Sequence, residues 1–422
     1  MKLIIKNVRA VDPVTGTDTV TDITADGGII TAVGQAGETN GARIIDGTGL
    51  VAFPGLMDMH VHFRDPGQTY KEDIITGTDA AKAGGFTAVC CMPNTKPPVD
   101  NEELVSYIYD KASKTGIDVY PVACITKGMQ SFELCDFDSL KRAGVYAISD
   151  DGRPVENAEL MRRALELSRD NGLAVLSHCE DINITRGGII NKGKVSKELG
   201  VGGLDRASED YITAREIALA MSCDARVHIC HVSTKGSVNI IRAAKKDGVK
   251  VTCETAPHYF TFTEDKLYSR DADFRMSPPL RTEEDRAAVE AAVLDGTIDC
   301  IITDHAPHSK EEKADFEKAP NGVVGLETSL AATLTKLYHT GKADLMKIAA
   351  LMSKNPREIV GVPVISICAG QPCDLTIFDP DYEWEVIPEE LHSKSKNSVF
   401  KGEKLKGKVL YTISKGKVVF EL

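Results

Sequence analysis

The chain has 422 residues, 42% of them hydrophobic, with 50 basic and 62 acidic side chains and a formal net charge of −12. This acidic balance argues against nucleic acid or an anionic membrane as partner, since both attract basic proteins. No apolar run approaches the roughly 18 residues that a membrane span needs.

The two ends of the chain share one pattern. Residues 1–52 and residues 364–422 alternate short apolar runs with glycine and aspartate turns, which predicts short β-strands. Because chain termini often lie together, we expect both segments to form one small β-sandwich domain. The residues between them, 53–363, are then left for a second and larger domain.

The central segment alternates predicted strands with predicted helices. The helices are expected at residues 71–83, 101–113, 157–170, 205–222, 236–246 and 282–294. The strands are expected near residues 56–63, 86–92, 117–125, 145–149, 173–178, 226–232, 250–255 and 298–304. Such alternation favours a parallel sheet, and eight units favour a closed (β/α)8 TIM barrel.

The first barrel strand ends on His60-Val61-His62, followed by Arg64. Side chains at i and i+2 of a strand point to one face, so the two imidazoles project together. Such a pair is half of a site for a divalent metal. The planar guanidinium of Arg64 lies on the same parity and suits a substrate carboxylate. Taken alone, the triplet is equally compatible with two unrelated histidines at a strand end.

Four further strands end on residues of the same kind, namely Asp151, His178, His231 and Asp304. A single polar residue there usually means only that the strand has reached solvent. Repetition on several strands indicates a shared site, because the carboxyl ends of barrel strands meet in one mouth. We therefore expect these four residues to join His60 and His62.

In this order the motifs resemble those of the amidohydrolase superfamily and, within it, of the class I dihydroorotases. The resemblance covers nearly the whole chain. It rests on residues 55–67, Met92-Pro93-Asn94-Thr95, Ser149-Asp150-Asp151-Gly152, His178-Cys179-Glu180-Asp181, residues 228–234, Pro278-Pro279-Leu280-Arg281 and residues 303–308.

The resemblance implies a hydrolase of cyclic amides that reversibly cyclises N-carbamoyl-L-aspartate to (S)-dihydroorotate plus water in pyrimidine biosynthesis. It implies one or two zinc ions, two being favoured, and Asp304 as the catalytic proton carrier. Asp151 takes a shared position where many relatives carry a carboxylated lysine; the nearest lysine, Lys141, precedes the strand. The implied metal ligands are His60, His62, Asp151, His178, His231 and Asp304.

The substrate contacts implied by the resemblance are His62, Arg64, Asn94, His308, Asn321 and Gly322. Two positions depart from the family pattern: Ser277 stands where asparagine is usual, and Asn321 replaces a commoner phenylalanine. The polar segment 309–320 is predicted to form a lid over the barrel mouth. The alternative is an exposed charged loop without a role.

Two other functions were weighed. A hydantoinase, dihydropyrimidinase or allantoinase is disfavoured by Arg64 and by the missing strand-4 lysine. A catalytically silent barrel that serves as a scaffold for aspartate transcarbamoylase would have lost metal ligands, and here all are present. The resemblance leaves open a homodimer and an association with that transcarbamoylase. Eleven scattered cysteines without a CxxC pair predict a reducing, cytoplasmic location.

Overall fold

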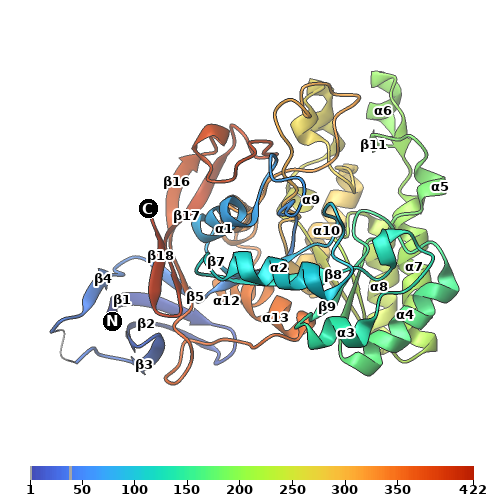
Figure 1. The fold of residues 1–422 in the computed structure, drawn as a ribbon. Helices are drawn as coiled ribbons and strands as arrows, with labels where there is room; N and C mark the ends of the chain where they lie inside the picture. The colour runs from blue at the N-terminus through green and yellow to red at the C-terminus, as the bar shows by residue number, and fades with distance from the viewer. Residues whose placement is uncertain (1, 38–39) are drawn as a thin grey trace.

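The computed structural model describes residues 2–37 and 40–422, which form a barrel and a sheet built from both chain ends. Figure 1 shows the blue N-terminal and red C-terminal strands on the same side of the molecule, with the helices of the barrel beyond them. Within the described ranges, no helix combines the length and the apolar character needed to cross a membrane.

The barrel confirms the eight predicted strands. Its strands are β6 (Leu56–Val61), β7 (Phe86–Cys91), β8 (Asp118–Ala123), β9 (Ala147–Ile148), β10 (Ala174–Ser177), β13 (Val227–Ile229), β14 (Val251–Thr255) and β15 (Cys300–Ile301). Neighbours pair in parallel in that order. The residues that follow β15 bond to the first strand, β6, and to His62 at its end. His62 N–H donates to the His305 carbonyl over 2.8 Å, and Thr303 Oγ1 donates to Asp58 over 2.5 Å. The sheet is thereby closed.

Helices follow the strands around the barrel. Asp73 caps the first of them by accepting from the backbone N–H of Ile75 and Thr76, and Gly172 ends the fourth in the left-handed region at φ 61°. The helices are α1 (Ile74–Ala83), α2 (Glu102–Ala112), α3 (Phe137–Arg142), α4 (Ala158–Asn171), α5 (Ile182–Thr185), α6 (Lys194–Leu199), α7 (Ala207–Ser222), α8 (Lys235–Lys246), α9 (Pro257–Thr261), α10 (Glu283–Asp295), α11 (Ser329–Thr333), α12 (Leu345–Ala349) and α13 (Asn355–Val360). A two-stranded sheet, β11 (Ile190–Asn191) and β12 (Gly203–Leu204), lies beside α5 and α6.

The terminal segments form one eight-stranded sheet, which confirms a small β domain made from both ends. Its order is β18 (Lys417–Glu421), β17 (Lys404–Ser414), β16 (Leu375–Glu385), β5 (Val51–Pro54), β1 (Leu3–Asp12), β2 (Thr17–Asp26) and β3 (Ile29–Val33), with β4 (Arg43–Asp46) paired to β1. The sheet has its own apolar core, in which Ile5, Ile23, Leu375 and Ile413 are buried. The link between the chain ends is the antiparallel pair β5 and β16.

The apolar run at residues 51–59 is divided between the two parts. It forms β5 in the terminal sheet and β6 in the barrel, with Gly55 between them. A Cβ at Gly55 would lie 2.2 Å from Thr87 Oγ1, so the chain can pass from sheet to barrel here only with glycine. The domain limits 1–52, 53–363 and 364–422 stay a prediction.

Candidate active site

The six predicted metal ligands meet at the carboxyl ends of the barrel strands. They lie at the ends of five barrel strands: His60 and His62 at β6, Asp151 after β9, and His178, His231 and Asp304 after β10, β13 and β15. All six are buried, and the most exposed of them, His178, retains 6% of its surface. Repetition of metal-ligating residues at strand ends therefore does mark one common site.

Asp151 lies at the centre of this cluster. Its Oδ1 is 3.3 Å from His60 Nε2, 3.4 Å from His178 Nδ1 and 3.4 Å from His231 Nε2. Its Oδ2 is 3.4 Å from His62 Nε2. Asp304 completes the group, with Oδ1 at 3.3 Å from His62 Nε2 and 3.7 Å from His60 Nε2. One carboxylate is thus shared by two triads, His60–His62–Asp151 and Asp151–His178–His231.

The donor atoms of this cluster fit divalent cations. His60 Nε2 and Asp151 Oδ1 are fully buried and have no hydrogen-bond partner, although they face each other. Unsatisfied buried polar atoms are costly unless something binds them. Donors held tetrahedrally at about 2.0–2.2 Å from zinc lie about 3.3–3.6 Å apart, which is the spacing seen around Asp151. Imidazole and carboxylate are the ligand types of such sites.

The two histidines of β6 are held by acceptors behind them. His60 Nδ1 donates to Glu254 Oε1 over 2.6 Å, and His62 Nδ1 donates to Asn94 Oδ1 over 2.8 Å. With Nδ1 donating its proton, each Nε2 faces Asp151, and its lone pair becomes available to a cation once Nε2 has lost its own proton. This arrangement fixes both tautomers for metal binding.

Glu254, on β14, is a functional residue that the sequence reasoning missed. It is fully buried, and its second oxygen lies 3.1 Å from Nε2 of His228, whose Nδ1 contacts Thr252 Oγ1. The interpretation of His228 as a structural histidine agrees with these contacts. The available signal was a single carboxylate in the interior of the predicted strand 250–255, since a buried acid needs partners.

The charges of the cluster are mutually dependent. Burial alone would raise the pKa of Asp151, but the charge of His60 and the nearby rings of His178 and His231 hold it well below its ordinary value. Burial likewise opposes a charge on His60, yet Asp151 and Glu254 raise its pKa well above the ordinary value. Binding of a cation therefore displaces protons from imidazole rather than from carboxylate.

The cluster opens into a cleft of about 330 Å³. The cleft is lined by all of the predicted substrate-contact residues and by Ser277; its walls include His62, Arg64, Asn94, Ser277, Asp304, His308, Asn321 and Gly322. Predicted metal ligands and predicted substrate contacts therefore share one cavity.

Arg64 is a buried cation on the wall of this cleft. It is 8% exposed, and burial lowers the pKa of its guanidinium to about 10. Its Nε donates to the Pro307 carbonyl over 3.3 Å, and a second nitrogen lies 3.4 Å from His308 Nε2. Within residues 2–37 and 40–422, it has no ion pair with a carboxylate. An anion in the cleft would supply that partner.

The wall opposite the metal ligands is formed by His308, Asn321 and Gly322. His308 Nε2 donates to the Asn321 carbonyl over 2.9 Å, and burial together with the nearby Arg64 and Lys71 lowers the pKa of this histidine strongly, so the ring is neutral. Gly322 has φ +141°, and a Cβ there would lie 2.7 Å from the Ala306 carbonyl oxygen. The Asn321 side chain accepts from Arg275, so its backbone, not its amide, borders His308.

The middle of the predicted lid segment 309–320 is buried and hydrogen-bonded to the rest of the protein. Lys313 and Phe316 are buried, and the Lys313 ammonium donates to the carbonyls of Arg275 and Pro320 over 3.1 Å and 3.0 Å. Closure of this segment over a substrate stays a prediction. His258 is also buried, its Nε2 has no hydrogen-bond partner among the described residues, and burial lowers its pKa to about 4.

Comparison with known proteins agrees with this site. Residues 49–237 match the family model described as "Dihydro-orotase-like". A dihydroorotase of Trichlorobacter lovleyi is 50% identical over 423 residues, covering 100% of this chain and 99% of the relative. A dihydroorotase of Citrifermentans bemidjiense is 50% identical over 424 residues, covering 100% of each.

Solved structures agree on the fold. The L-hydantoinase (dihydropyrimidinase) from Arthrobacter aurescens superposes with a TM-score of 0.88 at 24% identity, covering 99% of this chain and 96% of that one. The dihydropyrimidinase from Brevibacillus agri gives 0.87 at 23% identity, covering 100% and 95%. Such identities establish a common fold alone. Because the full-length relatives are about half identical, the chain belongs to the dihydroorotase family.

Proposed function

We propose that this protein is a dihydroorotase, which interconverts N-carbamoyl-L-aspartate and (S)-dihydroorotate in pyrimidine biosynthesis. The observation that carries the proposal is the position of Arg64, a buried guanidinium without an ion pair in the described chain, beside the histidine–aspartate cluster. Of the substrates weighed above, dihydroorotate combines a cyclic amide with a ring carboxylate. Arg64 would bind that carboxylate through two parallel charge-assisted hydrogen bonds.

The metal centre that we propose holds two zinc ions. His60 and His62 would hold one, His178 and His231 the other, with Asp151 shared between them and Asp304 facing the first. When bound, such ions make water acidic enough to act as a nucleophile near neutral pH and polarise the amide carbonyl. The shared carboxylate and the spacing of its neighbours support two ions over one.

Asp304 is the proposed proton carrier. It is 5% exposed, it lines the cleft, and the neighbouring His62, His60 and His231 keep its pKa below the ordinary value despite burial. It is therefore ionised and can accept a proton from the attacking water. In ring opening it would deliver that proton to the departing ring nitrogen, and in cyclisation the proton would move the other way.

The remaining residues orient the ring. Asn94 uses Oδ1 to accept from His62, which leaves its Nδ2 free to donate to a substrate oxygen. His308 is neutral and lies beside Arg64, where it can contact the same carboxylate. Ser277 lines the cleft with a hydroxyl in place of the usual amide.

The test is a substrate comparison with purified, zinc-loaded protein. Initial rates are measured for dihydroorotate, dihydrouracil, hydantoin and allantoin, and for cyclisation of carbamoyl-aspartate. We expect kcat/KM to be highest for dihydroorotate by orders of magnitude. A preference for dihydrouracil or hydantoin, which lack the carboxylate, would reject the proposal in favour of a hydantoinase-like activity.

We also propose a cytoplasmic location, which the eleven cysteines support: none forms a disulfide in the described chain, and ten are buried. A homodimer and an association with aspartate transcarbamoylase stay predictions. Light scattering of the protein alone and in mixture with a transcarbamoylase would measure both.

A further inference from the structure

A segment from the C-terminal part of the chain crosses to the substrate cleft. It lies between the short 3-10 helix η6 (Pro388–Glu390) and β17, and we call residues 393–397 the strap. Its polar side chains are buried: Ser393 is 1% exposed, Ser395 5% and Asn397 3%. Buried polar groups in a connecting segment need partners, and here the partners lie on the two walls of the cleft.

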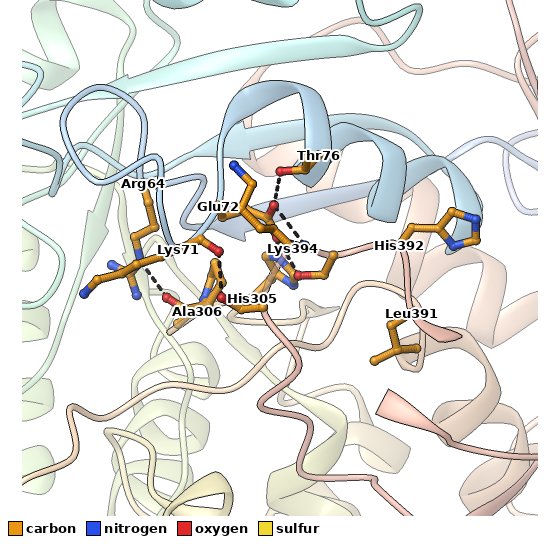
Figure 2. Close-up of polar contacts among 12 residues, drawn as sticks. Arg64, Lys71, Glu72, Thr76, His305, Ala306, Leu391, His392 and Lys394 are labelled. Carbon is orange, nitrogen blue, oxygen red and sulfur yellow. Dashed lines mark hydrogen bonds and ion pairs between the residues drawn. The ribbon is translucent and has the colours of Figure 1, made fainter. Parts of the chain in front are cut away.

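The first wall is the stretch that follows Arg64. The carboxylate of Glu72 is fully buried and accepts from the hydroxyl of Ser393 and from the Lys394 backbone N–H over 3.2 Å. Ser395 Oγ donates to the Lys71 carbonyl over 2.6 Å. Figure 2 shows Arg64, Lys71 and Glu72 in succession along this wall, facing His305, Ala306 and the strap.

The second wall contains the residues after β15. Asn397 Oδ1 accepts from the His308 backbone N–H over 3.2 Å. Its Nδ2 donates to the carbonyls of Gly322 and Ala306 over 2.9 Å and 3.4 Å. One amide group thus joins two stretches of backbone, 306–308 and 322, whose side chains and glycine line the cleft. Only a group with an acceptor and two donors at this position makes all three bonds.

We propose that Asn397 is a positioning residue for substrate recognition, and that the strap sets the distance between the walls that carry Arg64 and His308. The strap lines neither the metal cluster nor the cleft itself, and the contacts of the Asn397 side chain end on the backbone of residues 306, 308 and 322, which line the cleft. Its loss should therefore weaken substrate binding and leave the metal ligands in place. The identity of the substrate in this inference rests on the proposed function, whereas the hydrogen bonds of Asn397 do not depend on it.

The experiment compares Asn397→Ala with a matched control, Asn355→Ala. Asn355 also donates its amide to a backbone carbonyl, that of Asp299 over 2.7 Å, but at the amino end of the barrel strands. Zinc content, unfolding temperature, KM and kcat for dihydroorotate, and hydrogen–deuterium exchange of the peptide covering 305–324 are measured for both. A second variant, Ser395→Ala, removes one strap bond and serves if Asn397→Ala does not fold.

For Asn397→Ala we expect KM to rise roughly tenfold, the effect of losing about one well-placed hydrogen bond, with kcat changed less than about threefold. Exchange in 305–324 should accelerate and zinc content should stay at the wild-type level. Asn397→Asp keeps the acceptor for His308 N–H but loses both donors, so KM should still rise. Asn355→Ala should lower the unfolding temperature alone, and Ser395→Ala should raise KM less than Asn397→Ala does.

Unchanged exchange in 305–324, or a KM rise of the same size in Asn355→Ala, would overturn the positioning role. A loss of zinc in Asn397→Ala would overturn it too, because the metal cluster would then depend on the strap. If the wild-type protein does not turn over dihydroorotate, the proposed function fails. In that case the exchange measurement still decides whether Asn397 holds the cleft wall.

Discussion

Replacement of Arg64 by lysine isolates the geometry of carboxylate binding from its charge. A guanidinium has five N–H groups, and the Nε–H of Arg64 donates to the Pro307 carbonyl, which leaves the N–H groups of its two terminal nitrogens for a ligand. Lysine keeps the positive charge but cannot present two parallel donors to one carboxylate. One charge-assisted hydrogen bond contributes about 1.5–3 kcal/mol, so kcat/KM for dihydroorotate should fall about 10- to 100-fold.

Steady-state rates in both directions measure this fall, and zinc analysis should show unchanged metal content. Arg357→Lys is the matched control, because Arg357 is also a buried arginine (2% exposed) but bonds Gly55 and Thr87 far from the cleft. Its kcat/KM should stay near that of the wild type. If Arg64→Lys retained kcat/KM within about threefold of the wild type, the carboxylate would not be bound in the way proposed.

Three further predictions concern the cluster and the lid segment. Asp304→Asn should keep zinc, held by the histidines and Asp151, and lose about 10²–10⁴-fold in kcat; a metal-replete variant with normal turnover would refute the proton-carrier role. Glu254→Gln should weaken zinc affinity about 10–100-fold in a chelator competition, because Glu254 orients His60, and an unchanged affinity would contradict this. Burial lowers the pKa of Lys313 from 10.5 to about 7. Between these two pH values the unfolded state therefore binds more protons than the folded state, and the free-energy cost of burying this lysine decreases as pH rises. Urea unfolding of wild type and Lys313→Met at pH 6.5 and 9 should therefore show the wild type gaining stability relative to the variant at pH 9, and parallel profiles would refute it.

The barrel and the metal ligands were predictable because their signals are local. Each ligand ends an apolar strand, and the parity of His60 and His62 follows from strand geometry alone. The eight strands were placed within a few residues, although several are shorter than predicted; β9 and β15 have two residues each.

The supporting residues were not predictable, because their partners are remote in sequence. Glu254 lies 194 residues from His60, and Asn397 lies 89 residues from His308. The sequence around Glu254 and around Asn397 contains no periodic pattern or motif that would identify the hydrogen-bond partner of either residue. The passage from the terminal sheet to the barrel at Gly55 likewise depends on a residue outside the run 51–59, Thr87 of the next strand.

The position of Asp151 has a consequence for how the enzyme matures. The shared ligand that we propose, Asp151, is a side chain of the protein itself, and Lys141, the nearest lysine before the strand, donates to the Gly172 carbonyl on the outside of the barrel. Assembly of the centre therefore needs no carbon dioxide to build a carbamate on a lysine side chain. Apoprotein refilled with zinc in degassed, bicarbonate-free buffer should recover as fast as in air-equilibrated buffer, so this enzyme would be independent of the dissolved gas that carbamate-dependent relatives require.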